Sequence, residues 1–201
     1  MTVERFVDLA AEIRRRPARL GSVRFVAVDG PSGAGKTTFA QRLAGAIVRA
    51  GSRVEVVHTD DLLDGWGDQF TFWPRLESGV LEPLARGEPG RYPIYDWVRG
   101  RFGGDLRVPV PDVLIVDGGT SARADAYPRL SFSIFVTADR DLRLGRALAR
   151  DGATVEVPLL RWMAAEDDYF ATAATAERVD RLVDGVAPVG HDPEDEYVRL
   201  R

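Results

Sequence analysis

The residues with the clearest chemical pattern lie at positions 30–37, where the chain reads Gly-Pro-Ser-Gly-Ala-Gly-Lys-Thr. This segment fits the pattern G-x-x-x-x-G-K-[ST] and stands between an apolar run and a helical pattern, as a phosphate-binding loop requires. Glycines let backbone N–H groups turn inward around an anion, and the helix N-terminus adds partial positive charge. The pattern predicts that a nucleotide such as ATP is bound by Gly30, Ser32, Gly33, Ala34, Gly35, Lys36, Thr37 and Thr38.

Lys36 is the only lysine among 27 cationic residues. A compact ammonium group suits the neutralisation of β- and γ-phosphates, which gives Lys36 a catalytic role. Thr37 would offer its hydroxyl to Mg²⁺, which prefers oxygen ligands and bridges the same phosphates. The alternative interpretation is a glycine-rich turn with an exposed lysine.

Two aspartates follow expected strands. Asp117 ends the apolar run Val-Leu-Ile-Val-Asp and is the candidate second metal ligand, although Asp is also a common turn former. Asp60 follows the run at 53–58 and is the candidate base that accepts a proton from a substrate hydroxyl. It could instead cap the next helical turn.

Three arginines, Arg143, Arg146 and Arg150, have i, i+3, i+7 spacing and therefore share one face of a helix. They could stabilise charge on a transferred phosphoryl group. From spacing alone, a solvated arginine face is the slightly better explanation.

Alternation of apolar runs and helical patterns predicts an α/β fold of three layers, with a mostly parallel five-stranded sheet and helices on both faces. We expect a single domain over residues 1–201, with an N-terminal helix in 1–20, an irregular substrate-binding segment at 61–104, a lid region at 143–162 and a frayed acidic tail at 188–201. The expected strands cover 23–28, 53–58, 113–116, 132–136 and 181–183, and further helices cover 37–49 and 75–86.

Composition argues against several classes of partner and site. The net charge of −4 gives no general attraction to nucleic acid, and no apolar run approaches the roughly 20 residues that cross a bilayer, so we expect a soluble, cytoplasmic protein. Without cysteine there are no thiolate metal sites. Without asparagine or a second lysine, the chain cannot contain the N-K-x-D element of guanine-specific switches.

Three further segments resemble the uridine and cytidine kinase family in order and spacing. They read Pro-Ile-Tyr-Asp-Trp-Val at 93–98, Val-Leu-Ile-Val-Asp-Gly at 113–118 and Arg-x-x-Arg-x-x-x-Arg-Asp at 143–151, and the resemblance runs from about residue 23 to residue 151. In that family the first element lies along the nucleoside and the last leads into a lid over ATP. The resemblance implies an ATP- and Mg²⁺-dependent kinase in which Tyr95 and Trp97 contact the substrate, Asp60 is the base, and Arg146 and Arg150 face the phosphates.

The chain also departs from the family. Gly100 stands where the family has a histidine that helps to read the pyrimidine, and residues 152–158 contain no lid arginine, which leaves Arg161 as the only nearby substitute. Asp68 is an approximate counterpart of the ribose-binding aspartate. The family often forms oligomers, so a homo-oligomer is expected by resemblance only.

We therefore expect phosphoryl transfer to a small metabolite, with a nucleoside as the first candidate. The alternatives are another alcohol acceptor, such as nicotinamide riboside or pantothenate, and an ATP-binding regulatory protein with degenerate catalysis. The aromatic residues of the irregular segment could bind a planar base or form a satellite core. Trp162 and Phe170 are interpreted as packing residues, and His58 and His191 are not assigned to a metal.

Overall fold

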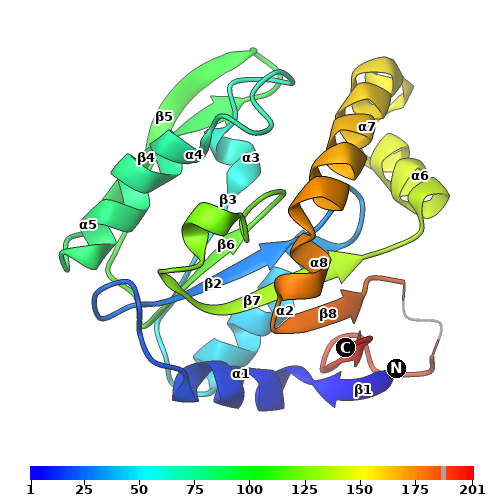
Figure 1. Cartoon of the computed structure of the whole chain (residues 1–201). Coiled ribbons are helices and arrows are strands. Elements are labelled where there is room, and N and C mark those ends of the chain that lie inside the picture. Colours follow the sequence, from blue (N-terminus) through cyan, green and yellow to red (C-terminus); the bar gives the residue numbers. More distant parts are fainter. Residues whose placement is uncertain (187–188) are drawn as a thin grey trace.

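The computed structural model describes residues 1–186 and 189–201. It contains a three-layer α/β fold around a seven-stranded sheet (Figure 1). The strands are β1 (Thr2–Arg5), β2 (Arg24–Asp29), β3 (Val54–His58), β4 (Gly90–Asp96), β5 (Arg101–Val108), β6 (Val113–Asp117), β7 (Leu130–Thr137), β8 (Arg181–Asp184) and β9 (Glu196–Arg199). The α-helices are α1 (Phe6–Arg15), α2 (Lys36–Arg49), α3 (Thr59–Leu62), α4 (Trp73–Leu76), α5 (Glu82–Ala85), α6 (Arg140–Asp151), α7 (Glu156–Ala173) and α8 (Thr175–Arg178). A π-helical segment, η1 (Glu77–Leu81), joins α4 to α5, and η2 (Ala124–Ala126) and η3 (Ala153–Val155) are 3₁₀ turns.

The order of strands in the sheet is β1-β9-β8-β7-β2-β6-β3. The five strands predicted from the sequence are the five that pair in parallel, β3, β6, β2, β7 and β8. The number five was nevertheless wrong, because β9 adds to β8 and β1 adds to β9, both antiparallel.

Side chains of β2 alternate between the two faces of the sheet. Val26 and Val28 pack in the cluster that contains α1 and α2, whereas Phe25 and Ala27 pack in the cluster that contains α4 and the segment after α3. Figure 1 shows α1 and α2 below the sheet and the other helices above or beside it. Such a parallel sheet is buried on both sides, as its continuous apolar strands predict.

Two expectations about irregular segments were wrong. The segment 61–104 contributes β4 to an antiparallel hairpin with β5, and residues 196–199 of the expected frayed tail form β9. Tyr197 and Val198 of β9 are buried, and the Tyr197 ring packs against Phe6 and Phe39. Burial of these side chains stabilises the C-terminal strand despite the acidic residues before it.

Gly100 ends the turn of the β4–β5 hairpin. Its φ is +64°, and its N–H donates to the carbonyl oxygen of Asp96 at 2.7 Å. A side chain is strained at this φ, which gives a physical reason for glycine at the position where the resembling family has histidine.

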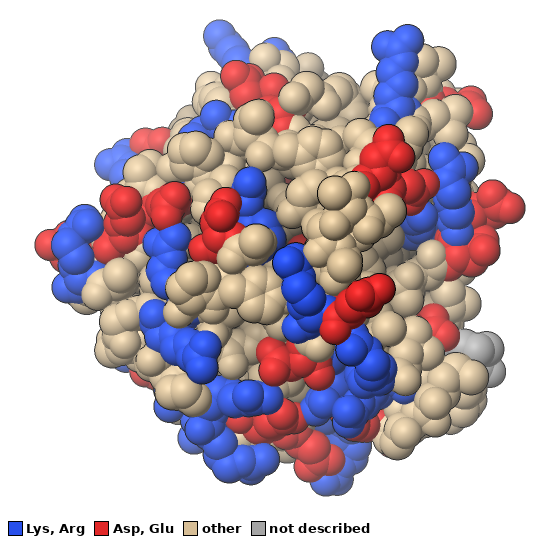
Figure 2. Space-filling view, viewed as in Figure 1, with Lys and Arg blue, Asp and Glu red and all other residues tan. Residues whose placement is uncertain are grey.

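Acidic and basic side chains are interspersed over the face seen in Figure 2. Within the described residues, no helix is both long and apolar enough to span a membrane.

Candidate active site

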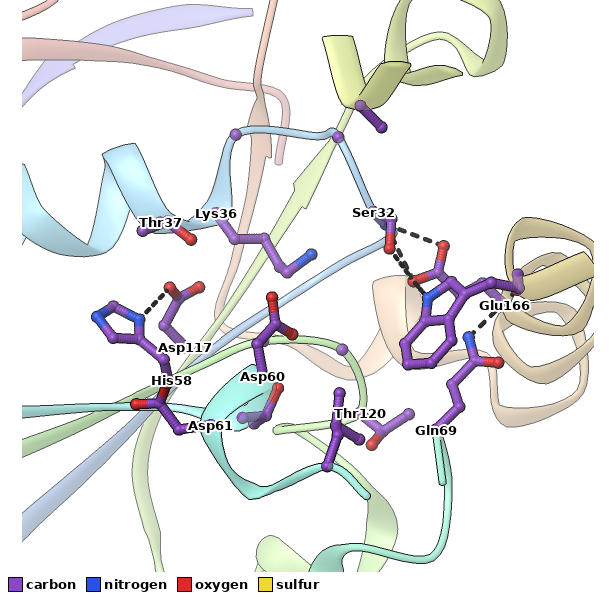
Figure 3. Close-up of a pocket in the computed structure, with 18 of the residues that line it drawn as sticks. Ser32, Lys36, Thr37, His58, Asp60, Asp61, Gln69, Asp117, Thr120 and Glu166 are labelled. Atoms are coloured by element: carbon purple, nitrogen blue, oxygen red, sulfur yellow. Dashed lines mark hydrogen bonds and ion pairs between the residues drawn. The ribbon is translucent and has the colours of Figure 1, made fainter. Parts of the chain in front are cut away.

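A cavity of about 560 Å³ opens at the carboxyl ends of β2, β3 and β6. Side chains from the loop before α2, from α3, from the segment after β6 and from α6 and α7 line it (Figure 3). This is the edge of a parallel sheet where ligands bind in α/β folds. Of the predicted residues it brings together Ser32, Gly33, Gly35, Lys36, Thr37, Thr38, Asp60, Asp117, Arg146 and Arg150.

The loop before α2 has the backbone of an anion cradle. Gly33 and Gly35 have φ of +76° and +100°, and a Cβ atom at Gly33 would lie 2.3 Å from the carbonyl oxygen of Arg143. Gly35 is the N-cap of α2 and provides no side-chain acceptor, and the first-turn amides of an α-helix have no partner within the helix. These amides are therefore available as donors to an anion at the start of α2. Gly30 and Ala34 are buried and support the loop instead of lining the cavity.

Asp29, which sequence reasoning did not single out, joins this loop to the segment after β6. Its buried carboxylate accepts the N–H groups of Gly30 at 2.6 Å, Thr120 at 2.8 Å and Ala122 at 2.9 Å. Burial raises its pKa to about 6, although the three N–H donors and Lys36 oppose this shift. Asp29 thereby sets the distance between the phosphate loop and the opposite wall of the cavity.

Asp117 lies at the carboxyl end of β6 and is 2% exposed. Its Oδ2 atom is 2.9 Å from Nδ1 of His58, whose pKa is raised by that hydrogen bond. Its Oδ1 atom is buried without a hydrogen-bond partner among the described residues. An oxygen in this condition beside Thr37 fits a Mg²⁺ ligand, because Mg²⁺ takes only one or two carboxylates and fills its remaining positions with phosphates and water. Among the described residues, no three His, Cys, Asp or Glu side chains form a cluster that could hold a metal ion.

Asp60 is in the first turn of α3 and extends into the same part of the cavity as Lys36 (Figure 3). Although its side chain is open to the cavity, the surrounding protein atoms desolvate the carboxylate and raise its pKa above the ordinary value, against the attraction of Lys36. Asp61 also lines the cavity and accepts a hydrogen bond from the Tyr92 hydroxyl at 3.4 Å. Within the part of the chain that the structure describes, the Asp60 carboxylate accepts no such hydrogen bond, which leaves it available to a ligand.

The three arginines of α6 have different positions. Arg146 lines the cavity and donates from Nη1 to the carbonyl oxygens of Gly33 at 3.4 Å and Gly185 at 3.1 Å. Arg150 lines the cavity while it pairs with Asp151. Arg143 is buried behind the loop and pairs with Asp167 at 3.3 Å. Arg161, the expected substitute for a lid arginine, is exposed and does not line the cavity.

Six uncharged residues also line the cavity, beside the buried carboxylate of Glu166. We call this set the neutral compartment; it consists of Leu63, Gln69, Phe72, Thr120, Trp162 and Phe170. The Oγ1 atom of Thr120 is buried without a partner among the described residues, and Gln69 donates from Nε2 to the carbonyl oxygen of Trp162 at 3.2 Å. Trp162 and Phe170 pack against the hydrophobic core, as predicted, and both also line the cavity.

Of the four residues predicted to contact a substrate, Asp60 lines this cavity, whereas Asp68, Tyr95 and Trp97 do not. Asp68 binds the N–H of Asp64 at 2.9 Å and pairs with Arg75. Tyr95 packs edge-on against Trp97, which donates from Nε1 to the carbonyl oxygen of Asp60 at 3.2 Å. The hairpin thus holds α3 in place, and substrate contact by Asp68, Tyr95 and Trp97 stays a prediction.

A second cavity of about 390 Å³ lies on the other side of the loop. Phe39, Val183 and Tyr197 contribute to its apolar wall. Gly35, Thr38 and Arg146 line both cavities, so the two spaces meet at the start of α2.

Comparison with known proteins shows the fold. The structure resembles that of a possible uridine kinase from Bacillus stearothermophilus, with a TM-score of 0.66 and 20% identity over 88% of this chain and 96% of that one. It also resembles a putative fructose transport system kinase from Silicibacter sp. TM1040, with a TM-score of 0.64 and 21% identity over 86% and 95% of the two chains. No family model matches the sequence, and no curated protein matches it. The chain therefore shares the overall α/β fold of these two proteins, as the sequence predicted.

Proposed function

We propose that this protein is a Mg²⁺-dependent kinase that transfers the γ-phosphoryl group of ATP to a hydroxyl group of a small, uncharged acceptor, with a nucleoside as the first candidate. The observation that carries the proposal is the position of Asp60. A carboxylate open to the cavity faces the ammonium group of Lys36 at the phosphate loop, with Asp117 at the end of the neighbouring strand.

Each group has a role in that reaction. Amides at the start of α2 and Lys36 hold the phosphates, and Arg146 and Arg150 add positive charge from α6. Thr37 and Asp117 would hold Mg²⁺, which supplies charge neutralisation when bound. Asp60 accepts the proton of the acceptor hydroxyl, for which its raised pKa is an advantage near neutral pH.

The second cavity suits the adenine base. It adjoins the loop through Gly35, Thr38 and Arg146, so a nucleotide could place its base against the apolar wall and its phosphates along the start of α2. The triphosphate would then point toward Lys36 and Asp60.

The neutral compartment supports an uncharged acceptor. Its six residues are uncharged and Glu166 lies beside them, so an acceptor carboxylate or phosphate placed against them would face an anion, while the cations Lys36, Arg146 and Arg150 of the cavity are assigned to the nucleotide phosphates. This favours a nucleoside or a sugar over pantothenate, which carries a carboxylate.

The experiment is an ADP-release screen with ATP and Mg²⁺ against uridine, cytidine, other nucleosides, nicotinamide riboside and pantothenate. We expect turnover with at least one nucleoside and none with pantothenate. Turnover with pantothenate alone would contradict the uncharged acceptor, and no turnover with any compound would favour a regulatory ATP-binding protein.

A further inference from the structure

One buried carboxylate of α7 contacts the phosphate loop itself. Oε1 of Glu166 accepts the Ser32 hydroxyl at 2.7 Å and the Trp162 Nε1–H at 2.9 Å, and the Ser32 N–H lies 3.0 Å from Oε1 and 2.9 Å from Oε2 (Figure 3). Glu166 is 3% exposed. An anionic side chain therefore uses two donors of a loop whose pattern predicts anion binding.

Ser32 lies at the end of the loop that faces the acceptor. It lines the larger cavity with Lys36 and Asp60, but it does not line the second cavity. A nucleotide with its base in the second cavity passes Thr38 and Gly35 first and reaches Ser32 last. With the base in the second cavity, as proposed above, the donors of Ser32 lie on the side of the terminal phosphoryl group of a triphosphate, and a diphosphate extends less far toward them.

A second partner for Glu166 is already in place. The Nη1 atom of Arg143 is buried, has no hydrogen-bond partner among the described residues and lies 4.0 Å from Oε2 of Glu166. A small rotation of the Glu166 side chain would release Ser32 and satisfy this guanidinium group. Since a buried N–H group without a hydrogen-bond partner is costly, the Nη1 group of Arg143 lowers the cost of that rotation.

We propose that Glu166 is a specificity-determining residue that distinguishes nucleoside triphosphates from diphosphates by competing with the γ-phosphate for Ser32. This inference rests on the proposed function, because it requires a nucleotide at the loop. A diphosphate binds with Glu166 on Ser32, whereas a triphosphate binds only when Glu166 moves to Arg143, since two anions repel each other at this distance. Trp162 shares Oε1 of Glu166 and lines the neutral compartment, so arrival of the γ-phosphate also alters the wall that meets the acceptor.

The test is calorimetric binding of ADP and of a non-hydrolysable ATP analogue, each with Mg²⁺, to the full chain and to Glu166→Gln. Glutamine keeps the size of the side chain and removes its charge. We expect Glu166→Gln to tighten binding of the analogue about tenfold and to change ADP affinity less than twofold. Asp168→Asn, an equal charge change at an exposed position of α7, is the control and should leave both affinities within twofold.

A second variant tests the movement. Arg143→Gln removes the alternative partner, so it should weaken binding of the analogue in the wild-type background and have less than a twofold effect on it in the Glu166→Gln background, with folding checked by thermal melting. Equal changes in ADP and analogue affinity in Glu166→Gln, or weaker binding of the analogue, would overturn the inference and leave the proposed function intact. Failure of the unaltered protein to bind either nucleotide would overturn the proposed function and this inference together.

Discussion

The phosphate loop and the neutral compartment face each other across one cavity, but the chain builds them in different ways. The loop consists of consecutive residues between β2 and α2, so its chemistry is fixed by local sequence. The neutral compartment takes Leu63 and Phe72 from the segment after α3, Thr120 from the segment after β6, and Trp162 and Phe170 from α7. Substitutions in distant segments can therefore alter the neutral compartment while the phosphate loop stays constant. Related folds keep one chemistry and change the substrate in this way.

Among the substitutions that test this comparison, the largest loss of activity is expected at Lys36. Lys36→Ala removes the ammonium group that neutralises the transferred phosphoryl group, and we expect kcat/KM to fall about 10³-fold or more. ATP affinity should fall as well. ADP release measures the first and calorimetry the second; Arg86→Ala, at an exposed ion pair with Glu88, is a control. A variant with normal ATP binding would contradict the assignment of the loop.

Asp60 lines the same cavity as the phosphate loop and the neutral compartment, and its substitution should lower kcat more than it lowers ATP affinity. Asp60→Asn cannot accept a proton, so we expect kcat to fall about 10²-fold or more while ATP affinity changes little. Because desolvation raises the pKa of Asp60, turnover of the unaltered protein should fall as the pH drops through that raised value. If Asp61→Asn has the larger effect on kcat, the base is Asp61.

Asp29 holds the two sides at a fixed distance, and its removal should reduce stability. In Asp29→Asn the amide group would face at least one of three backbone N–H donors, which costs about 1 to 3 kcal/mol and lowers the melting temperature by about 2 to 4 °C for each kcal/mol. Calorimetric melting of the variant measures this loss. An unchanged melting temperature would show that the contact does not stabilise the fold.

The same residue should give stability a defined pH dependence. The pKa of Asp29 is about 6 in the folded protein and ordinarily 3.8, so the folded state binds more protons between these values and its stability falls as the pH rises from about 4 to 6. This one group accounts for up to about 3 kcal/mol. The difference in melting temperature between the protein and Asp29→Asn, followed from pH 4 to pH 7, isolates it, because other carboxylates contribute to both. A difference that does not change with pH would mean that Asp29 does not titrate in this range.

The smallest effect is expected in the neutral compartment. Gln69→Ala removes one uncharged hydrogen-bonding group, so we expect the KM of the acceptor to rise about fivefold and the KM of ATP to stay within twofold. Steady-state kinetics with both substrates varied separates these effects. If the KM of ATP rises instead, Gln69 contacts the nucleotide, which would contradict the assignment of the neutral compartment to the acceptor.

Features of the fold and site that consecutive residues build could be predicted from the sequence, whereas features that distant residues build could not. Strands β6 and β7 were predictable because buried strands are continuous apolar runs, and β3 was predictable from its alternating, valine-rich pattern. Strands β1 and β9 were not, because each has four residues and its partner lies at the opposite end of the chain. Likewise Lys36 and Asp117 belong to local motifs, whereas the contact between Ser32 and Glu166 joins residues 134 positions apart, and no local pattern marks it.

The pairing of β1 with β9 has a practical consequence. Thr2 lies opposite Arg199 at the edge of the sheet, so a short linker could join the ends of the chain. New ends could then be opened at the exposed turn around Val98, which is 97% exposed, to give a circular permutant. In such a molecule the first and last strands would become an internal hairpin, and the split β4–β5 ribbon would offer attachment points for a reporter close to the mouth of the cavity.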